Sequence, residues 1–185
     1  DLGAAYNQEK PSNTHILYQI NNYKTFQYLW ANKKWNHLNA SVLFLNNGME
    51  RHYMQGGEEL GMTHFTQTFG THLIYNPSKF NLTAYGYLQT GADKNNRKVS
   101  AYNASIAGTY KPVKNLGVTL GAEVLSGTSE EATTDQYNRS FSPLYGTNHG
   151  FNGFMDYFYV GNHEGSVGLI DVFLKLNYNK GKFGI

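Results

Sequence analysis

Apolar and polar residues alternate along the segment 116–125, which reads LGVTLGAEVL. A period of two is typical of a β-strand with one apolar and one polar face. The apolar face would carry Leu116, Val118, Leu120, Ala122 and Val124, and the polar face Gly117, Thr119, Gly121 and Glu123. Other segments repeat the pattern over about 9 to 13 residues, near the length with which a tilted strand crosses a bilayer.

The pattern predicts eight strands and a short C-terminal stub, joined by connections that alternate between long and short. The expected strands are 1–7, 23–31, 35–46, 62–76, 80–89, 99–110, 116–125 and 166–178. The long connections are 8–22, 47–61, 91–98 and 126–165, and the short ones 32–34, 77–79, 111–115 and 179–182. Tight turns at one rim and long loops at the other are typical of outer-membrane barrels.

We therefore expect an all-β fold, a transmembrane antiparallel β-barrel, with residues 1–185 forming a single β-barrel domain. The chain starts and stops within predicted strands, so we expect a domain that is incomplete at both ends and part of a larger barrel. A soluble β-sandwich rich in Tyr and Thr is the alternative.

The amino-acid composition excludes several classes of protein. Charged residues make up 15% of the chain, against about 25% in soluble domains, and the mean hydropathy is nevertheless −0.52. No basic run suggests a nucleic-acid partner, and the absence of Cys excludes disulfides and thiolate metal sites. No apolar stretch is long enough for a transmembrane helix.

The alternation assigns side chains to the lipid or to the pore. We expect Val118, Leu120, Val124, Ile170, Val172 and Leu174 to face lipid. The expected pore-lining residues are His37, Asn39, His64, Thr66, Thr83, Tyr85, Asn103, Ser105, Thr119, Glu123, Asp171 and Lys175. A charge between apolar neighbours points into water or into a pair, so Asp171 and Lys175 either pair with neighbouring strands or set the electrostatics of the pore.

Aromatic residues recur beside the turns, and we expect them to form a girdle at the membrane interface. They are Tyr23, Phe26, Trp30, Trp35, Tyr75, Phe80, Tyr102, Tyr110 and Tyr178. Ordinary cross-strand aromatic pairing is the alternative.

Catalytic and metal chemistry find little support. The seven His residues are scattered, so we expect no metal and no cofactor. A hydrolytic site could combine Ser140 or Ser142 with His149 and Asp156, but no nucleophile elbow surrounds either serine. We expect no enzyme.

The segment 140–158 reads SFSPLYGTNHGFNGFMDYF and carries many aromatics and three glycines. Its aromatics need burial, so we expect an ordered loop that folds inward as a constriction. The expected constriction residues are Tyr145, Asn148, His149, Asn152 and Asp156. A loop packed on itself above the barrel is the alternative.

This segment resembles the alginate-export family of outer-membrane barrels, especially members from Bacteroidetes-type bacteria. The resemblance implies a monomeric barrel of about 18 strands, within the range that such barrels span, of which this chain would form a C-terminal portion. One departure concerns charge, because an alginate conduit is expected to have a lumen rich in Arg and Lys. Here only Lys175 is clearly cationic on the inward faces, so the basic residues would have to lie in the other half.

The expected function is an outer-membrane porin for passive transport of polysaccharide or small polar solutes. A structural or docking barrel subunit of a larger cell-envelope complex is the alternative, and a membrane-embedded hydrolase is a third class. The expected partners are membrane lipid and lipopolysaccharide, a polysaccharide or small solute, and envelope proteins.

Overall fold

The computed structural model describes residues 1–7, 23–129, 136–144, 166–180 and 183–184. These residues form strands and no helix. The strands are β1 (Leu2–Tyr6), β2 (Thr25–Lys34), β3 (Leu38–Gln55), β4 (Glu58–Tyr75), β5 (Phe80–Ala92), β6 (Lys98–Val113), β7 (Leu116–Leu125), β8 (Tyr137–Asn138), β9 (Leu169–Lys180) and β10 (Phe183–Gly184). Among the described residues, no helix has the length and apolar character needed to cross a bilayer.

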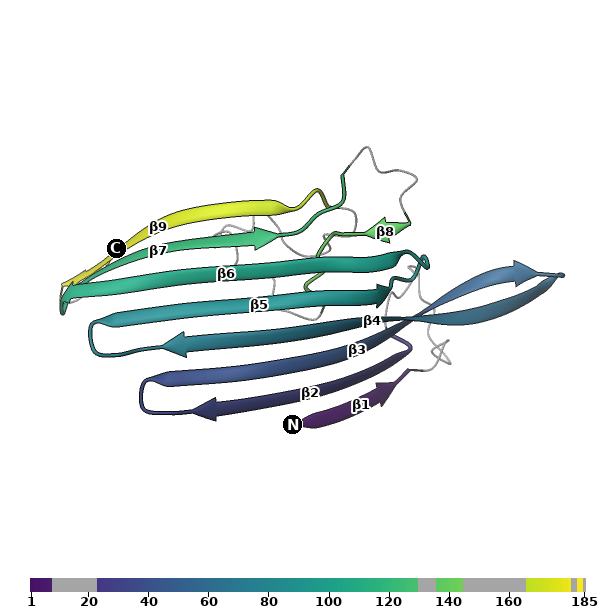
Figure 1. Cartoon of the computed structure of the whole chain (residues 1–185), viewed down its shortest axis with the longest axis horizontal. Helices are drawn as coiled ribbons and strands as arrows, with labels where there is room; N and C mark the ends of the chain where they lie inside the picture. The colour runs from purple at the N-terminus through teal and green to yellow at the C-terminus, as the bar shows by residue number, and fades with distance from the viewer. Residues whose placement is uncertain (8–22, 130–135, 145–165, 181–182, 185) are drawn as a thin grey trace.

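The strands form one antiparallel sheet in which each strand pairs with the next along the chain (Figure 1). The order is β1-β2-β3-β4-β5-β6-β7-β9-β10, and the short strand β8 lies off this path, parallel to β6. Within the described residues β1 and β10 pair with only one neighbour each, so the sheet has two free edges. The all-β antiparallel fold is confirmed, whereas closure into a barrel remains a proposal.

The pairing register assigns each side chain to one of two faces. On one face, Leu120 lies between Gly108 of β6 and Leu174 of β9. On the other, Glu123 lies between Ser105 and Asp171. We call the first the apolar face and the second the polar face. The expected division therefore holds: Val118, Leu120, Val124, Ile170, Val172 and Leu174 share the face opposite to Thr119, Glu123, Asp171 and Lys175.

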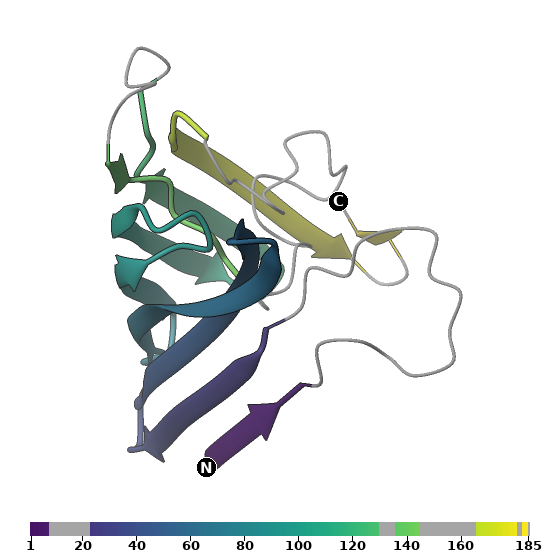
Figure 2. The same cartoon turned by 90° about the vertical axis from the view of Figure 1, so that its right-hand side faces the viewer.

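Burial on the two faces is the reverse of that in a soluble sheet protein. Every buried non-glycine residue of strands β3 to β7 lies on the polar face: Asn47, Thr68, Gln89, Val99, Ala101, Asn103, Glu123 and Leu125. On the apolar face Leu120 is 63% exposed and Val172 69% exposed. Figure 2 shows the cause, because the sheet curves so that β1 and β9 turn toward the same side. Curvature crowds the concave face, and burial identifies this as the polar one.

The expected turn at 32–34 and the expected loop 47–61 are wrong in detail. Strand β2 continues through Lys34, and the chain turns at residues 35–37. Strands β3 and β4 pair from Leu38↔Tyr75 to Gln55↔Glu58, so residues 47–61 form a long hairpin. Gly56 and Gly57 make its turn with φ values of 63° and 87°, a left-handed conformation that glycine adopts at little cost.

This hairpin projects beyond its neighbours, as Figure 1 shows. The pairing of β2 with β3 ends at Gly48, and that of β4 with β5 ends at Thr66. Near the base of the hairpin, Glu50 Oε2 forms an ion pair with Lys24 Nζ at 3.1 Å. Exposed apolar side chains follow farther out: Tyr53, Met54, Leu60 and Met62.

Candidate functional site

The polar face contains a hollow of about 690 Å³ between β2 and β7. Its volume falls within the range of about 300–1,000 Å³ typical of small-molecule sites. Polar lining residues are Asn32, Asn39, Ser41, Thr68, His72, Gln89, Asn103 and Glu123, and apolar or aromatic ones include Phe26, Trp30, Leu43, Leu45, Tyr85, Tyr87 and Phe141. Leu43 and Leu45, which break the alternation in β3, thus line this hollow.

Glu123 is the centre of the hydrogen-bonded cluster in the hollow. It is only 6% exposed, and its Oε1 accepts bonds from Tyr85 Oη and Asn103 Nδ2, each at 2.9 Å. The Oδ1 atom of Asn103 is buried and has no hydrogen-bond partner among the described residues. Leaving a buried acceptor unpaired costs about 1–3 kcal/mol, so this oxygen is a place where a donor would be favoured.

A second carboxylate lies next to this cluster, outside the lining of the hollow. Asp171 of β9 is the direct cross-strand partner of Glu123, and like charges at such positions are destabilising. No Lys or Arg lies within salt-bridge distance of either carboxylate in the described residues. Lys175, on the same face, places its Nζ 4.5 Å from the ring centroid of Phe173.

Aromatic rings follow one another across the hollow. Ring centroids of His72 and Tyr85 are 6.1 Å apart, those of Tyr85 and Tyr87 are 5.9 Å apart, and those of Tyr87 and Phe141 are 6.4 Å apart. The tilted geometries, between 42° and 52°, match the offset arrangements that aromatic rings prefer. The hollow therefore combines an aromatic wall with a buried acid.

The segment 140–144 covers part of the hollow. Phe141 is 6% exposed, and the Gln89 side chain bonds the Ser142 backbone in both directions. Gln89 Nε2 donates to Ser142 O at 2.6 Å, while Ser142 N donates to Gln89 Oε1 at 2.9 Å. Thr68 Oγ1 accepts a further bond from Gln89 Nε2 at 3.2 Å. This described part of the expected constriction packs on the polar face, whereas Tyr145, Asn148, His149, Asn152 and Asp156 lie outside the described residues.

Ser140 is the structural support of this segment. Its hydroxyl donates to Ser166 O at 2.6 Å, its Oγ lies within hydrogen-bond distance of Thr128 Oγ1 at 3.0 Å, and the residue is 2% exposed. Asn138 Nδ2 donates to Asp93 Oδ2 at 3.1 Å, which attaches the segment to the β5–β6 turn. The hydroxyl considered as a nucleophile is thus engaged in structural bonds, and His149 and Asp156 lie outside the described residues.

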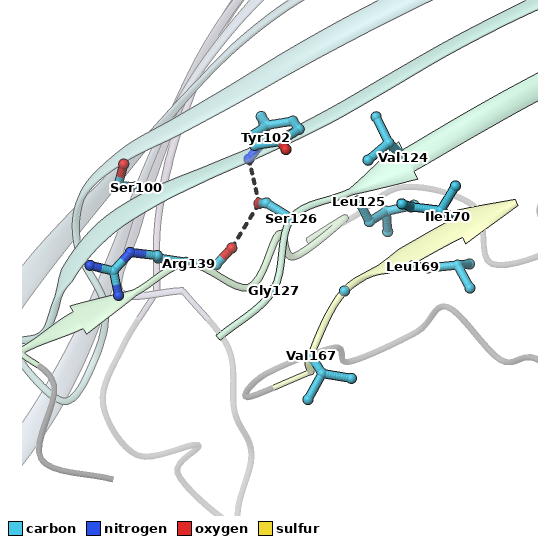
Figure 3. Close-up of a pocket in the computed structure, with 11 residues that line it drawn as sticks. Ser100, Tyr102, Val124, Leu125, Ser126, Gly127, Arg139, Val167, Leu169 and Ile170 are labelled. Atoms are coloured by element: carbon cyan, nitrogen blue, oxygen red, sulfur yellow. Dashed lines mark hydrogen bonds between the residues drawn. The ribbon is translucent and has the colours of Figure 1, made fainter. Parts of the chain in front are cut away.

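A second hollow, of about 710 Å³, lies where β7 ends and β9 begins (Figure 3). Ser126 Oγ accepts a bond from Tyr102 N and donates to Arg139 O, both at 2.7 Å. Its lining, as far as the structure describes it, contains no carboxylate and is built around these backbone bonds. We regard it as a structural junction, and the hollow around Glu123 as the candidate site.

The structure places most of the expected pore-lining residues on one face. Asn39, Thr66, Thr83, Tyr85, Asn103, Ser105, Thr119, Glu123, Asp171 and Lys175 all project from the polar face of paired strands. His64 shares that face in the projecting part of β4. His37 is an exposed residue of the turn between β2 and β3, outside the paired strands.

The expected aromatic girdle divides between the two faces. Tyr75, Phe80, Tyr110 and Tyr178 lie on the apolar face beside the tight turns, and the Phe80 and Tyr110 rings are 4.8 Å apart. Phe26 and Trp30 lie instead on the polar face and line the hollow. The alternation of apolar and polar residues predicts that these two side chains share a face, but it does not predict which face that is.

Comparisons with protein-family models, with curated proteins and with solved structures found no match. In the described residues no group of three or more His, Cys, Asp or Glu is placed to hold a metal ion. The candidate site therefore rests on its own geometry.

Proposed function

We propose that this chain forms part of an outer-membrane β-barrel, a porin whose polar face lines a water-filled pathway for small polar solutes or polysaccharide. The observation that carries the proposal is the inverted burial of the sheet. Exposing Leu120, Ile170 and Val172 to water over a contiguous apolar face would be costly, since soluble monomers rarely expose patches larger than a few hundred Å². Lipid would cover that face at no such cost.

Further features support a membrane setting. Aromatic side chains at the tight-turn end of the apolar face suit the headgroup region. At the opposite end, a polar ladder begins on the same face. Asn46 Nδ2 donates to Gln27 Oε1 at 2.7 Å, and Gln67 Nε2 donates to Asn46 Oδ1 at 2.8 Å. The aromatic rim at one end of this apolar band matches the aromatic girdles that flank the lipid-facing band of membrane barrels.

The lining residues support passage of polar solutes rather than a sealed core. Asn, Ser, Thr and His side chains supply donors and acceptors along the polar face, and the segment 140–144 narrows it. Alginate export, suggested by the resemblance, is part of the proposal only as one solute class. Among the described residues, the lining of the hollow includes a carboxylate and no Lys or Arg, which disfavours an anionic solute at this position.

Conductance tests the proposal. The intact protein in a planar bilayer should give discrete current steps. Neutralising Asp171 and Lys175 together should change the ion selectivity while the far-ultraviolet spectrum is retained, because charges beside a narrow path bias which ions enter. A folded protein that never conducts would contradict transport.

A second candidate function, a docking subunit of an envelope complex, is favoured by the projecting β3–β4 hairpin. Its exposed Met54, Leu60 and Met62 lie beyond the pairing range of β2 and β5. Stable co-purification of an envelope protein, lost when Met54 and Met62 are both replaced by Ser, would support docking. Replacing exposed Val113 at the other end of the sheet by Ser is the matched control.

A further inference from the structure

The hollow on the polar face holds a buried acid whose charge no described cation balances. Glu123 is satisfied by two neutral donors, Tyr85 and Asn103. Burying a carboxylate away from water is costly unless a counter-charge accompanies it. The lining residues that the structure describes include no Lys or Arg, so they present a net negative charge at a desolvated position.

Neighbouring groups strengthen this field. Asp171 is the cross-strand partner of Glu123 and lies just outside the lining of the hollow, and charges of one sign beside a cleft concentrate ions of the opposite sign. Lys175 is two cross-strand positions farther along, opposite Thr119. Its ammonium lies over the Phe173 ring and makes no recorded ion pair with Glu123 or Asp171 in the described residues.

The remaining lining suits the body of an organic cation. Trp30, Tyr85, Tyr87 and Phe141 present aromatic rings around the hollow, and cations within about 6 Å of such ring centroids are attracted to their faces. Asn103 Oδ1 accepts no hydrogen bond from any described residue. A ligand that carries N–H groups could satisfy this oxygen after a small rotation of the amide, whereas a quaternary ammonium could not.

We propose that this hollow binds a small organic cation, a primary ammonium attached to an aromatic or apolar body. The ammonium would lie against Glu123, with the charge of Asp171 on the neighbouring strand nearby, and the body would stack along the Tyr85–Tyr87–Phe141 wall. The inference deepens the proposed function and rests on it for access, since the polar face must line a space that solutes enter.

The test is calorimetric titration of the intact protein in detergent with 2-phenylethylamine, and with 2-phenylethanol as the neutral probe of similar shape. The amine should bind saturably and the alcohol at least about tenfold more weakly, as expected for losing a charge-assisted contact. Glu123→Gln should weaken amine binding by a similar factor and remove the preference. Glu58→Gln, at an exposed acid of the hairpin, is the matched control and should change nothing.

The inference can still be tested if Glu123→Gln folds poorly. Asp171→Asn, at a less buried position, should weaken the amine alone, and the comparison between amine and alcohol in the unaltered protein needs no variant. Equal affinities for the two probes, or unchanged amine binding in Glu123→Gln, would overturn the inference. Conductance without amine preference contradicts this inference only, whereas amine binding without conductance contradicts transport.

Discussion

The ring of Tyr87 lies over Gly70, its direct partner on the neighbouring strand, on the polar face of the sheet. The same arrangement joins Phe173 to Gly121. In each pair the ring occupies the space that a side chain would fill if the glycine had one. Aromatic rings are known to cover strand glycines in this way. This packing places Tyr87 between Tyr85 and Phe141 in the wall of the hollow.

Gly70→Ala should therefore destabilise the protein. A Cβ at this position would overlap the Tyr87 ring, and forcing a group into a packed site costs about 1–3 kcal/mol. Gly86→Ala is the control, because a Cβ there meets nothing within 4 Å. Urea unfolding from lipid vesicles measures both, and equal effects would contradict the proposed packing.

Arginine substitutions test which face meets lipid. Leu120→Arg and Val172→Arg should each cost about 2–4 kcal/mol if the side chains lie near the middle of the bilayer. Thr119→Arg, on the polar face beside Leu120, should cost less because that face would meet water. Similar losses for Thr119 and Leu120 would contradict a lipid-facing apolar surface.

The two tryptophans report on opposite environments. Trp35 lies exposed at a tight turn with Lys33 Nζ 5.4 Å from its ring, whereas Trp30 lines the hollow. In Trp30→Phe, the remaining fluorescence should be quenched by headgroup-labelled lipid, since tryptophan prefers that depth. In Trp35→Phe, it should be quenched by aqueous acrylamide and little by labelled lipid. The reverse pattern would place the polar face against lipid.

Gln89 controls the segment over the hollow. Gln89→Ala removes the side-chain bonds to Ser142 and Thr68, and each lost bond costs about 0.5–1.5 kcal/mol. Amide exchange at Ser142 should accelerate by about tenfold or more, following the usual relation between free energy and population. Gln89→Glu is the matched comparison, because it keeps the acceptor for Ser142 N–H while placing a second oxygen against Ser142 O. Unchanged exchange in Gln89→Ala would show that other contacts hold the segment.

The period of two predicted the strands and their faces well, because sheet side chains alternate whatever surrounds the sheet. The segment 116–125 coincides with β7, and Glu123 was correctly placed opposite Leu120. The hairpin tip was missed because glycine and charge between Asn47 and Gly61 look like a loop, although the two arms pair with each other.

The hollow was harder to predict. Phe26 and Trp30 belong to its lining, yet aromatic residues near turns also suit a membrane rim. The bonds of Glu123 depend on three strands coming together in register, β5, β6 and β7. Sequence reasoning identified all three residues of this cluster as inward-facing, but periodicity alone contains no information about which of them touch.

The diglycine turn at Gly56–Gly57 is also a suitable site for inserting a foreign peptide. A Cβ at either position meets nothing within 4 Å. The two arms of the hairpin, β3 and β4, pair with each other through backbone hydrogen bonds up to this turn. Residues inserted there should not disturb the pairing of the neighbouring strands, since exposed loop tips tolerate insertion best. If the sheet lies in an outer membrane as proposed, an antibody against a peptide tag in this place should bind either intact or only permeabilised cells, and the outcome would give the orientation of the whole sheet.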